Sequence, residues 1–412
     1  MTPTKREATM LLEFTCSNVR SIRDTVKLDL RANTDDTFEN NLLRFENERV
    51  HPACAIYGSN ATGKTSVLTG MAIMQTMVTT SHLLQPGDLL PRTPHRLSQD
   101  KPTEYQMEFV WKKTRYIYKF SYDNQKILKE SLSYAPNGRM GAIFTRDGNK
   151  VKVAEKFSRI ETLCKEKLTA NKLVLSLAVN NLNYEELAGA FLFYKDGLVI
   201  LMNDNNNWLE YSASKFEHDK AIKEMFLKFM KDTGSDIVDI KAHSEQRLMT
   251  AAELPPDMPQ AVKAMFLNQT VVSTVVKTVY KGFTLDIIEE SMGTQKLIRM
   301  MCPIMDIFQK GKTFVCDEIE SHLHPLIVRQ LVGRFIRGKA SDAQIICATH
   351  NIEMLDLKLF RRDQIWFTDI NPDYHRTTLK ALSSYPCRKD DNVQKKYLES
   401  KYCKVARDVW AE

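Results

Sequence analysis

YGSNATGKTSVL, residues 57–68, is the most informative stretch of this 412-residue chain. It contains the pattern G-x-x-x-x-G-K-[ST] of a phosphate-binding loop. The residues that satisfy the pattern are Gly58, Gly63, Lys64 and Thr65. An apolar run, ACAIY, comes directly before the loop and a helical pattern follows it, so the expected order of strand, loop and helix is present. The stretch therefore predicts a nucleotide site.

Each residue type in this loop has a physical role toward a nucleotide. Glycines let backbone N–H groups turn toward phosphates, and the positive end of the following helix points at them. Lys64 supplies a positive charge for the β and γ phosphates, and the Thr65 hydroxyl is a ligand for Mg²⁺. We also expect Asn60 and Ser66 to contact the nucleotide, which is predicted to be ATP. The simpler interpretation is a glycine turn before an ordinary helix.

A second motif, KTFVCDE at residues 312–318, is typical of an apolar strand that ends in two acids. Asp317 is predicted to hold Mg²⁺ through its water shell, and Glu318 to orient or deprotonate the attacking water. Lys64 and Asp317 are 253 residues apart, and compact P-loop kinases and small GTPases seldom need so much intervening structure. The spacing therefore indicates a larger ATPase.

Two further segments flank the acidic strand. ESMGTQKL (290–297) comes before it, and IICATHN (345–351) comes after it as an apolar strand ending in His350. In this order the motifs resemble those of ABC-type ATPases: phosphate loop, Ser-x-Gly signature, acidic strand and switch histidine. The resemblance implies a catalytic role for His350, and a head-to-tail dimer in which Ser291 and Gly293 contact ATP bound by a second copy. Taken singly, SMGT would be a helix N-cap and the histidine a core residue.

The fold class that these motifs imply is α/β. We expect an ABC-type P-loop ATPase head, built from a mixed sheet with flanking helices and an antiparallel β lobe, with a mostly helical insertion. Residue patterns predict two strands in 10–30, an antiparallel meander in 103–135 and an amphipathic helix in 215–232. The predicted domains are the first ATPase lobe, the insertion, the second ATPase lobe and a tail, at residues 1–150, 151–275, 276–370 and 371–412.

Composition limits the class of protein. With 43% hydrophobic and 26% charged residues the chain is ordinary for a globular protein, and its net charge of +7 permits nucleic acid as a partner without arguing for it. Cys54, Cys316 and Cys347 lie in apolar runs and no C-x-x-C pair occurs, which indicates free thiols in buried strands. No apolar run reaches the ~18 residues that span a bilayer. We therefore expect a cytoplasmic protein without a membrane partner.

Nearly the whole chain is similar to bacterial OLD-like ATPases of phage defence, particularly the RloA/AbiL-type subunit encoded beside a second protein. The motifs that carry the resemblance are FTCSNVRSIRD, YGSNATGKTS, ESMGTQKLI, CDEIESHLHP, ATHN and LFRRDQIWF, in that order. It implies an ATP-driven switch or scaffold that answers a phage-encoded trigger and controls a separate effector, such as a nuclease or toxin. The chain departs from the family at Met292 and in its last segment, LESKYCKVARDVW.

Other functions remain open on the sequence. Only 62 residues follow His350, too few for the nuclease domain of larger OLD proteins, so we expect ATP hydrolysis and no nuclease in this chain. One alternative is a DNA-repair or DNA-end-binding ATPase of the Rad50-like class without the long coiled coil. Another is an assembly platform that binds ATP and barely turns it over.

Weaker candidates each have an ordinary explanation. Gln106 is a candidate to bind or sense Mg²⁺, although an exposed strand glutamine is the simpler interpretation. Arg20 could reach the nucleotide or lie in a surface turn, and Arg361 with Arg362 could contact a partner or the base, or form a solvated pair. The loop at 321–324 is expected to communicate between two ATP sites.

The basic tail, residues 392–410, is predicted to be one helix. It could dock a partner or nucleic acid, and packing on its own domain with a solvated basic face is the simpler interpretation.

Overall fold

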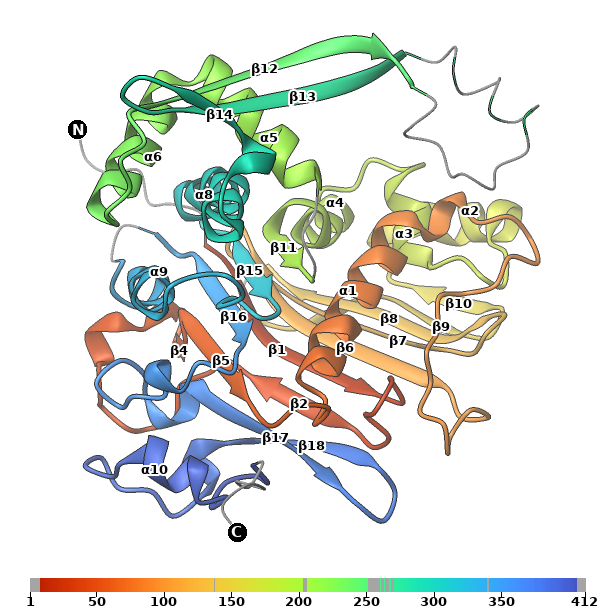
Figure 1. Cartoon of the computed structure of the whole chain (residues 1–412). Coiled ribbons are helices and arrows are strands. Elements are labelled where there is room, and N and C mark those ends of the chain that lie inside the picture. The colour runs from red at the N-terminus through yellow and green to blue at the C-terminus, as the bar shows by residue number, and fades with distance from the viewer. Residues whose placement is uncertain are drawn as a thin grey trace. The chain divides into compact units, whose positions relative to one another are not determined.

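The computed structural model describes residues 8–136, 138–202, 206–250, 260, 263, 267, 270–338 and 341–405. The chain divides into two compact units, which we call the first unit and the second unit. The first comprises Met1–Met202, Ile307–Ser321 and Val328–Glu412, and the second comprises Asn203–Asp306 and His322–Ile327. Figure 1 labels most of the helices and strands of both units.

An antiparallel sheet of seven strands forms one layer of the first unit (Figure 1). In spatial order its strands are β10 (Lys150–Val153), β9 (Gly141–Asp147), β8 (Ile127–Ala135), β7 (Thr114–Tyr122), β6 (Thr103–Trp111), β1 (Thr9–Ser17) and β2 (Val26–Asp29). It contains the strand pair predicted in 10–30 and the meander predicted in 103–135. Large aromatic side chains such as Phe14, Tyr105 and Phe120 are buried on it, which explains the apolar–polar alternation of the sequence.

A second sheet of six strands carries the sequence motifs. Its spatial order is β11 (Leu198–Leu201), β15 (Thr313–Cys316), β16 (Gln344–Ala348), β5 (Ala53–Tyr57), β17 (Ile365–Asn371) and β18 (Arg376–Ala381). All neighbours are parallel except β17 and β18. Cys54, Cys316 and Cys347 are buried in β5, β15 and β16, as predicted.

Helix α1 (Lys64–Thr80) packs against strands of both sheets, β1 and β16. Its Gly70 lies so close to β1 that an added Cβ would be 3.3 Å from Phe14 and 3.4 Å from the Cys16 sulfur. The buried side chain of Gln344 joins the sheets directly, because its Oε1 accepts from the Leu11 backbone N–H at 2.6 Å while its Nε2 donates to the Leu11 carbonyl at 3.1 Å. The core therefore holds the two sheets and α1 as one body.

The remaining elements of the first unit are short. The strands and helices are β3 (Leu43–Phe45), β4 (Glu48–Val50), α2 (Arg159–Lys167), α3 (Val174–Val179), α4 (Glu185–Leu192), α9 (Pro325–Arg337, whose first turn belongs to the second unit) and α10 (Val393–Leu398). Single turns occur at η1 (Glu39–Asn41), η2 (Ser81–Leu83), η3 (Glu155–Phe157), η4 (Phe193–Gly197), η7 (Ile352–Met354), η8 (Arg362–Gln364) and η9 (Leu382–Ser384). No helix in the described part of the chain is long and apolar enough to cross a membrane.

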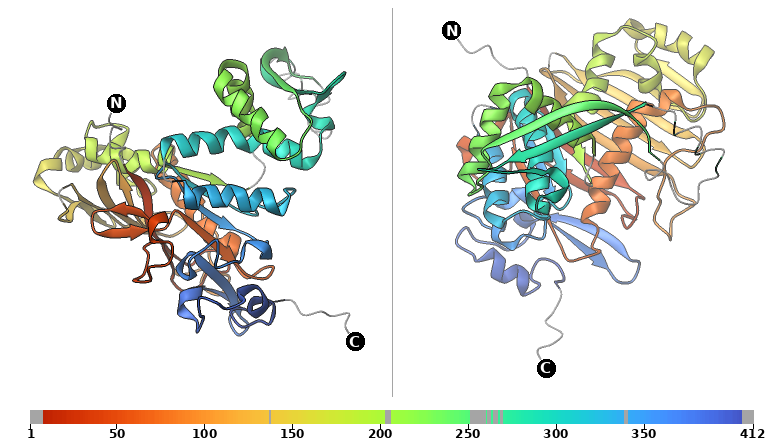
Figure 2. Two further views of the ribbon diagram at one scale, coloured as in Figure 1. Left: turned by 90° about the vertical axis from the view of Figure 1, so that its left-hand side faces the viewer. Right: turned by 45° about the horizontal axis from the view of Figure 1, so that its top comes forward.

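The second unit contains a long antiparallel hairpin (Figure 2). Its elements are α5 (Asn206–His218), α6 (Lys220–Asp232), β12 (Asp239–Leu248), β13 (Thr270–Val279), β14 (Thr284–Asp286), η6 (Ile287–Glu289) and most of α8 (Met292–Lys310). The single helix predicted in 215–232 is two helices, because Asp219 has an extended backbone and its carboxylate caps α6 by accepting from the Ile222 N–H at 3.1 Å.

Within its described residues, the interval expected to be mostly helical, 151–275, holds α2 to α6 and also four segments of strand, the first of which is the end of β10. β11 joins the six-stranded sheet beside β15, and β12 with the start of β13 forms the hairpin. A run as short as LVIL in β11 does not distinguish a buried strand from a buried helix by periodicity, which is why the sequence pattern missed it.

Candidate nucleotide-binding site

Parallel strands bring three of the sequence motifs to one edge of the six-stranded sheet. β5 leads into Gly58, β15 into Asp317, and β16 into His350. β16 lies between the other two strands, so the histidine emerges between the phosphate loop and the acidic pair. The carboxyl edge of a parallel sheet is where α/β proteins bind ligands, so these strands position the site.

The two glycines of the loop are required by close contacts. Gly63 has φ +104°, and an added Cβ would lie 2.1 Å from the Thr377 Oγ1. At Gly58 an added Cβ would lie 2.3 Å from the Thr368 Oγ1. Both threonines come from the β17–β18 hairpin, which therefore packs directly on the phosphate loop.

Hydrogen bonds between hydroxyl groups hold the phosphate loop against the β17–β18 hairpin. The Thr377 Oγ1 donates to the Thr62 carbonyl at 2.9 Å, and the Thr62 Oγ1 lies 2.7 Å from the Thr368 Oγ1. The Ser66 hydroxyl is hydrogen-bonded within the protein, because its Oγ is 2.8 Å from the Ser21 Oγ. The two threonines of the β17–β18 hairpin were missed by the sequence analysis, since nothing in the local sequence links them to a loop more than 300 residues earlier.

Lys64 is buried against the loop that precedes it. Its side chain is 6% exposed, and its Nζ donates to the carbonyls of Gly58 at 2.8 Å and Ser59 at 3.0 Å. Burial lowers the pKa of Lys64, and the negative charge of Asp317 is the largest influence that raises it again. Asn60, by contrast, is exposed at the tip of the loop.

Asp317 has the features of a ligand for a divalent cation. Its Oδ1 is buried and has no hydrogen-bond partner, and its carboxylate accepts a hydrogen bond from the Thr65 side chain. Burial raises the pKa of Asp317, with the Glu318 carboxylate adding to the rise and Lys64 opposing it. An orphaned carboxylate oxygen beside a hydroxyl suits Mg²⁺, which prefers oxygen ligands. The residues present therefore fit the cation that the sequence predicts.

Glu318 and His350 are the exposed groups of the site. Glu318 has a positive φ of 45°, which turns it away from the buried strand that precedes it. Burial lowers the pKa of His350, and the charge of Lys64 lowers it further. The carboxylates that raise it are Glu320, Glu318 and Asp317, in that order. The lowered pKa favours the neutral imidazole, which donates one hydrogen bond and accepts another.

Glu320 is a site residue that the sequence analysis did not single out. Its Oε2 accepts from the Thr349 hydroxyl at 2.7 Å, and its Oε1 accepts from the backbone N–H of His350. The only available signal was its place in CDEIES, two residues after Glu318.

The signature residues belong to the second unit. Ser291 is exposed and caps α8, because its Oγ accepts from the Thr294 N–H at 3.2 Å. Gly293 allows a close approach, since an added Cβ would be 2.7 Å from the carbonyl oxygen of His322 in the loop at 321–324. Ser291 is thus the N-cap of α8, as the simpler interpretation of SMGT has it, and its side chain is still exposed.

Two weaker candidates have partners other than the acidic pair. The Gln106 Nε2 lies 3.4 Å from the Glu13 Oε1, and within the described residues no contact joins Gln106 to Asp317 or Thr65. The metal role of Gln106 therefore gains no support from its position. Arg20 donates to the Thr69 Oγ1 of α1 at 3.1 Å, one turn beyond the start of that helix.

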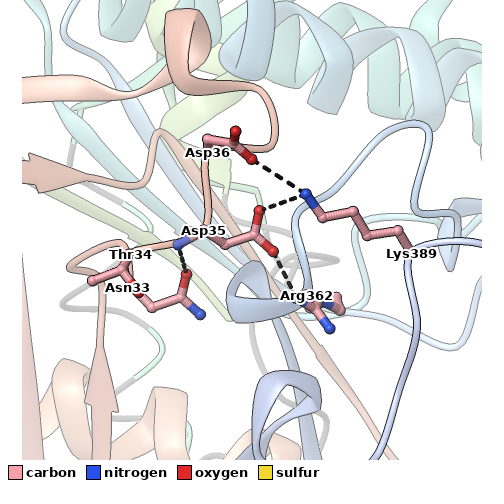
Figure 3. Close-up of a pocket in the computed structure, with 6 residues that line it drawn as sticks. All are labelled: Asn33, Thr34, Asp35, Asp36, Arg362 and Lys389. Carbon is pink, nitrogen blue, oxygen red and sulfur yellow. Dashed lines mark hydrogen bonds and ion pairs between the residues drawn. The ribbon is translucent and has the colours of Figure 1, made fainter.

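Arg361 and Arg362 are not a solvated pair, which corrects the simpler sequence interpretation. Arg361 is 2% exposed and pairs with Asp363, the Nε to Oδ1 distance being 3.0 Å. Arg362 binds Asp35 at 2.6 Å, and Lys389 reaches the same carboxylate at 3.2 Å across a hollow of about 510 Å³ (Figure 3). Arg362 and Lys389 hold the loop after β2 through its Asp35 carboxylate, and Arg361 holds the same loop by donating to the Thr37 carbonyl and the Asn33 Oδ1.

The tail packs on its own unit, and the prediction of a single helix is wrong. Helix α10 ends at Leu398, and the chain then turns back toward the phosphate loop. The Ser59 Oγ donates to the Lys404 carbonyl at 2.7 Å, and the Tyr402 ring stacks on Phe367 with centroids 5.0 Å apart. A Tyr397 hydroxyl that is hydrogen-bonded to the Gly58 backbone completes the contact. Residues 406–410 of the predicted helix lie outside the described residues.

Comparisons with solved structures give low overall similarity. The SMC head domain from Thermotoga maritima is 11% identical with a TM-score of 0.38, over 90% of this chain and 98% of that one. A Pyrococcus furiosus Smc head with an extended coiled coil, bound to the C-terminal domain of ScpA, is 13% identical with a TM-score of 0.39, over 91% and 97%. No curated protein matches the sequence.

A family model matches residues 54–356, from the strand before the phosphate loop to the segment after the switch histidine. Its description is "AAA domain, putative AbiEii toxin, Type IV TA system". The fold is the predicted mixed α/β head of an ABC-type P-loop ATPase, with an antiparallel lobe beside the sheet that carries the motifs. By this match, which covers well over half of its length, the chain belongs to that AAA-domain family of P-loop ATPases.

Proposed function

We propose that this protein binds ATP with Mg²⁺ and hydrolyses it at sites shared between two copies of the chain. The observation that carries the proposal is the buried, unpartnered Oδ1 of Asp317 beside Thr65, at the sheet edge that also holds Lys64. A buried acceptor left without a partner costs about 1–3 kcal/mol, so such an atom is expected to have a ligand in the working state.

In this proposal, different residues of the first unit bind the phosphates, hold the cation and activate the attacking water. Lys64 leaves its loop carbonyls to pair with the β and γ phosphates, and the backbone N–H groups of the loop orient them. When bound between Thr65 and Asp317, Mg²⁺ would neutralise charge that develops on the phosphates. Glu318, exposed beside this pair, orients the attacking water and accepts its proton. The neutral imidazole of His350 completes the hydrogen bonds around that water or the γ-phosphate.

A second copy supplies the signature. Ser291 is exposed at the N-terminus of α8, where a hydroxyl, a bare glycine backbone and the helix dipole together suit an anion. Apolar side chains flank it: Ile288 is 80% exposed and Met292 50% exposed. Large apolar groups left in water beside an anion-binding turn support contact with another protein surface, and the copy-to-copy contact of ABC-type ATPases fits this chemistry.

The biological role that we propose is an ATP-driven switch or scaffold in phage defence. The family description names a putative toxin of a type IV TA system. Together with the resemblance to OLD-like defence ATPases, this supports control of a separate effector, a nuclease or toxin, in response to a phage-encoded trigger. Stimulation of turnover by DNA ends would instead favour a DNA-repair ATPase.

Mixing two inactive variants tests the shared site. Lys64→Ala removes the phosphate loop cation and Ser291→Arg blocks the signature, so each variant alone should lack turnover. In a mixed dimer one site keeps an intact Lys64 and an intact Ser291. Equal mixing makes half of the dimers mixed, so turnover should recover to about a quarter of the wild-type rate. Confirmed mixed dimers without recovered turnover would contradict the shared site, and a wild-type protein without ATP binding would contradict the whole proposal.

A further inference from the structure

We propose that Glu320 is a positioning residue that ties the acidic loop after β15 to the switch-histidine segment after β16. The inference rests on the proposed ATPase reaction and adds to it a residue that holds two parts of the site in register. It concerns one carboxylate and its two hydrogen bonds, to the Thr349 hydroxyl and to the backbone N–H of His350.

Both oxygens of the Glu320 carboxylate are engaged. Oε2 accepts from the Thr349 Oγ1 at 2.7 Å, and Oε1 accepts from the His350 N–H. Thr349 is fully buried, and its hydroxyl also accepts from the Asn351 N–H at 3.0 Å. The carboxylate therefore holds the His350 backbone directly and the Asn351 backbone through the Thr349 hydroxyl, at the point where β16 ends.

This arrangement distinguishes Glu320 from the other two acids of its loop. Asp317 has an oxygen free of protein partners, and Glu318 is exposed. Each oxygen of Glu320 accepts a hydrogen bond from a neighbour in the protein, so we assign it a positioning role. Charge-assisted hydrogen bonds to a carboxylate are about twice as strong as neutral ones, which suits a structural tie.

The tie joins elements that the sheet already places side by side. β15 and β16 are parallel neighbours, with Cys316 opposite Cys347. Asp317 follows the first strand directly and His350 follows the second after one residue. A movement of the acidic loop would therefore carry the His350 backbone with it. Without Glu320 the two loops could shift separately, and a displacement of about 1 Å at a reacting centre can cost about 100-fold in rate.

Charge gives the proposal a second readout. The groups that act on the imidazole are Lys64, which lowers the pKa of His350, and Glu320, Glu318 and Asp317, which raise it. Removing the negative charge of Glu320 removes one of the influences that raise the pKa. The His350 pKa should then fall further below its usual value, whereas a purely structural change with no charge effect would leave it in place.

The test compares Glu320→Gln and Thr349→Val with a matched control, Glu353→Gln. Glu353 is an exposed glutamate on η7, close to His350 in the sequence. We expect ATP turnover to fall about 10- to 100-fold in Glu320→Gln with ATP affinity within about twofold of the wild type, because the histidine is misplaced rather than removed. The control variant, Glu353→Gln, should have the ATP turnover and the ATP affinity of the wild type.

NMR of the nucleotide-free protein tests the tie independently of hydrolysis. In labelled protein, assigned with a His350→Gln spectrum, the backbone amide proton of His350 should move upfield in Glu320→Gln as its charged acceptor is lost. The imidazole pKa should fall in the same variant and stay unchanged in Thr349→Val, which keeps the carboxylate.

The outcomes separate the two proposals. An unmoved His350 amide and pKa in Glu320→Gln, or moved signals with unchanged turnover, would overturn the positioning role. A wild-type protein that does not hydrolyse ATP would overturn the proposed function, while the spectra would still show whether the tie exists.

Discussion

The phosphate loop and the signature turn both stand at the start of a helix, and we propose that both bind phosphate, but their side chains differ in exposure. In the loop, Lys64 is 6% exposed and neighbouring hydroxyls are paired with threonines from the β17–β18 hairpin. In the signature turn Ser291 is exposed, with Ile288 80% exposed three residues before it. The loop is completed inside one chain, whereas the turn offers its groups outward. The proposed function therefore assigns nucleotide binding to the loop of one copy and the completion of the site to the signature turn of another.

The largest expected effect is the loss of ATP binding when the phosphate loop is changed, because the loop binds the nucleotide and the signature only completes the site. Lys64→Ala should abolish ATP binding and lower turnover by at least about 100-fold, because no other described cation contacts the loop carbonyls that Lys64 occupies. Binding of a fluorescent ATP analogue and phosphate release measure the two quantities. Lys119→Ala, at an exposed lysine on β7, is the matched control and should behave as wild type.

Next in size is the loss of the proposed base. Glu318→Gln should lower turnover by about 100-fold or more and leave ATP binding intact, since general-base removal affects only the chemical step. Single-turnover hydrolysis beside equilibrium binding checks this. Turnover that survives in the variant would show that Glu318 is not the base, and another group would then have to activate the attacking water.

The third prediction concerns the packing of the loop itself. Gly63→Ala should destabilise the protein by about 2–3 kcal/mol, from a left-handed backbone and a collision with Thr377. Gly87→Ala is the matched control, because Gly87 has φ +93° but no atom within 4 Å of an added Cβ. Chemical denaturation of both variants isolates the close contact. Equal losses would mean that the threonine yields and that the loop is less tightly held than the structure indicates.

The smallest effect on stability is expected at the signature. Ile288→Ser should change the free energy of unfolding by less than about 0.5 kcal/mol, because the side chain is exposed. It should nevertheless weaken ATP-dependent dimers about 10-fold, measured by sedimentation in a Glu318→Gln background. Leu83→Ser, at a 66% exposed leucine of the first unit, is the control. Unchanged dimers in Ile288→Ser would remove the apolar flank from the proposed interface.

Residues with local chemical meaning were predictable from the sequence. Lys64 and Thr65 follow from a compact motif, and Asp317 with Glu318 follows from an apolar strand that ends in acids. Glu320, Thr368 and Thr377 were not predictable, because their role depends on which loops the sheet order brings together. The same reason explains Arg361 and Arg362, whose carboxylate partners include Asp35, more than 300 residues earlier. Periodicity also missed β11 and the break at Asp219, where a short run and a single cap decide the structure.

By itself the sequence determined the class of protein, through a phosphate loop, a strand that ends in two acids and a strand followed by a histidine, in that order. The glycines and lysine before a helix, and the acids after a strand, lie within a few neighbouring residues. They can therefore be recognised in the sequence without the fold. Only the tertiary structure decided which contacts hold the site in place. The hairpin at residues 365–381 packs on the phosphate loop, and the Glu320 carboxylate joins the segment after β15 to the segment after β16. Such contacts join residues far apart in the chain, and only the folded sheet sets their distances.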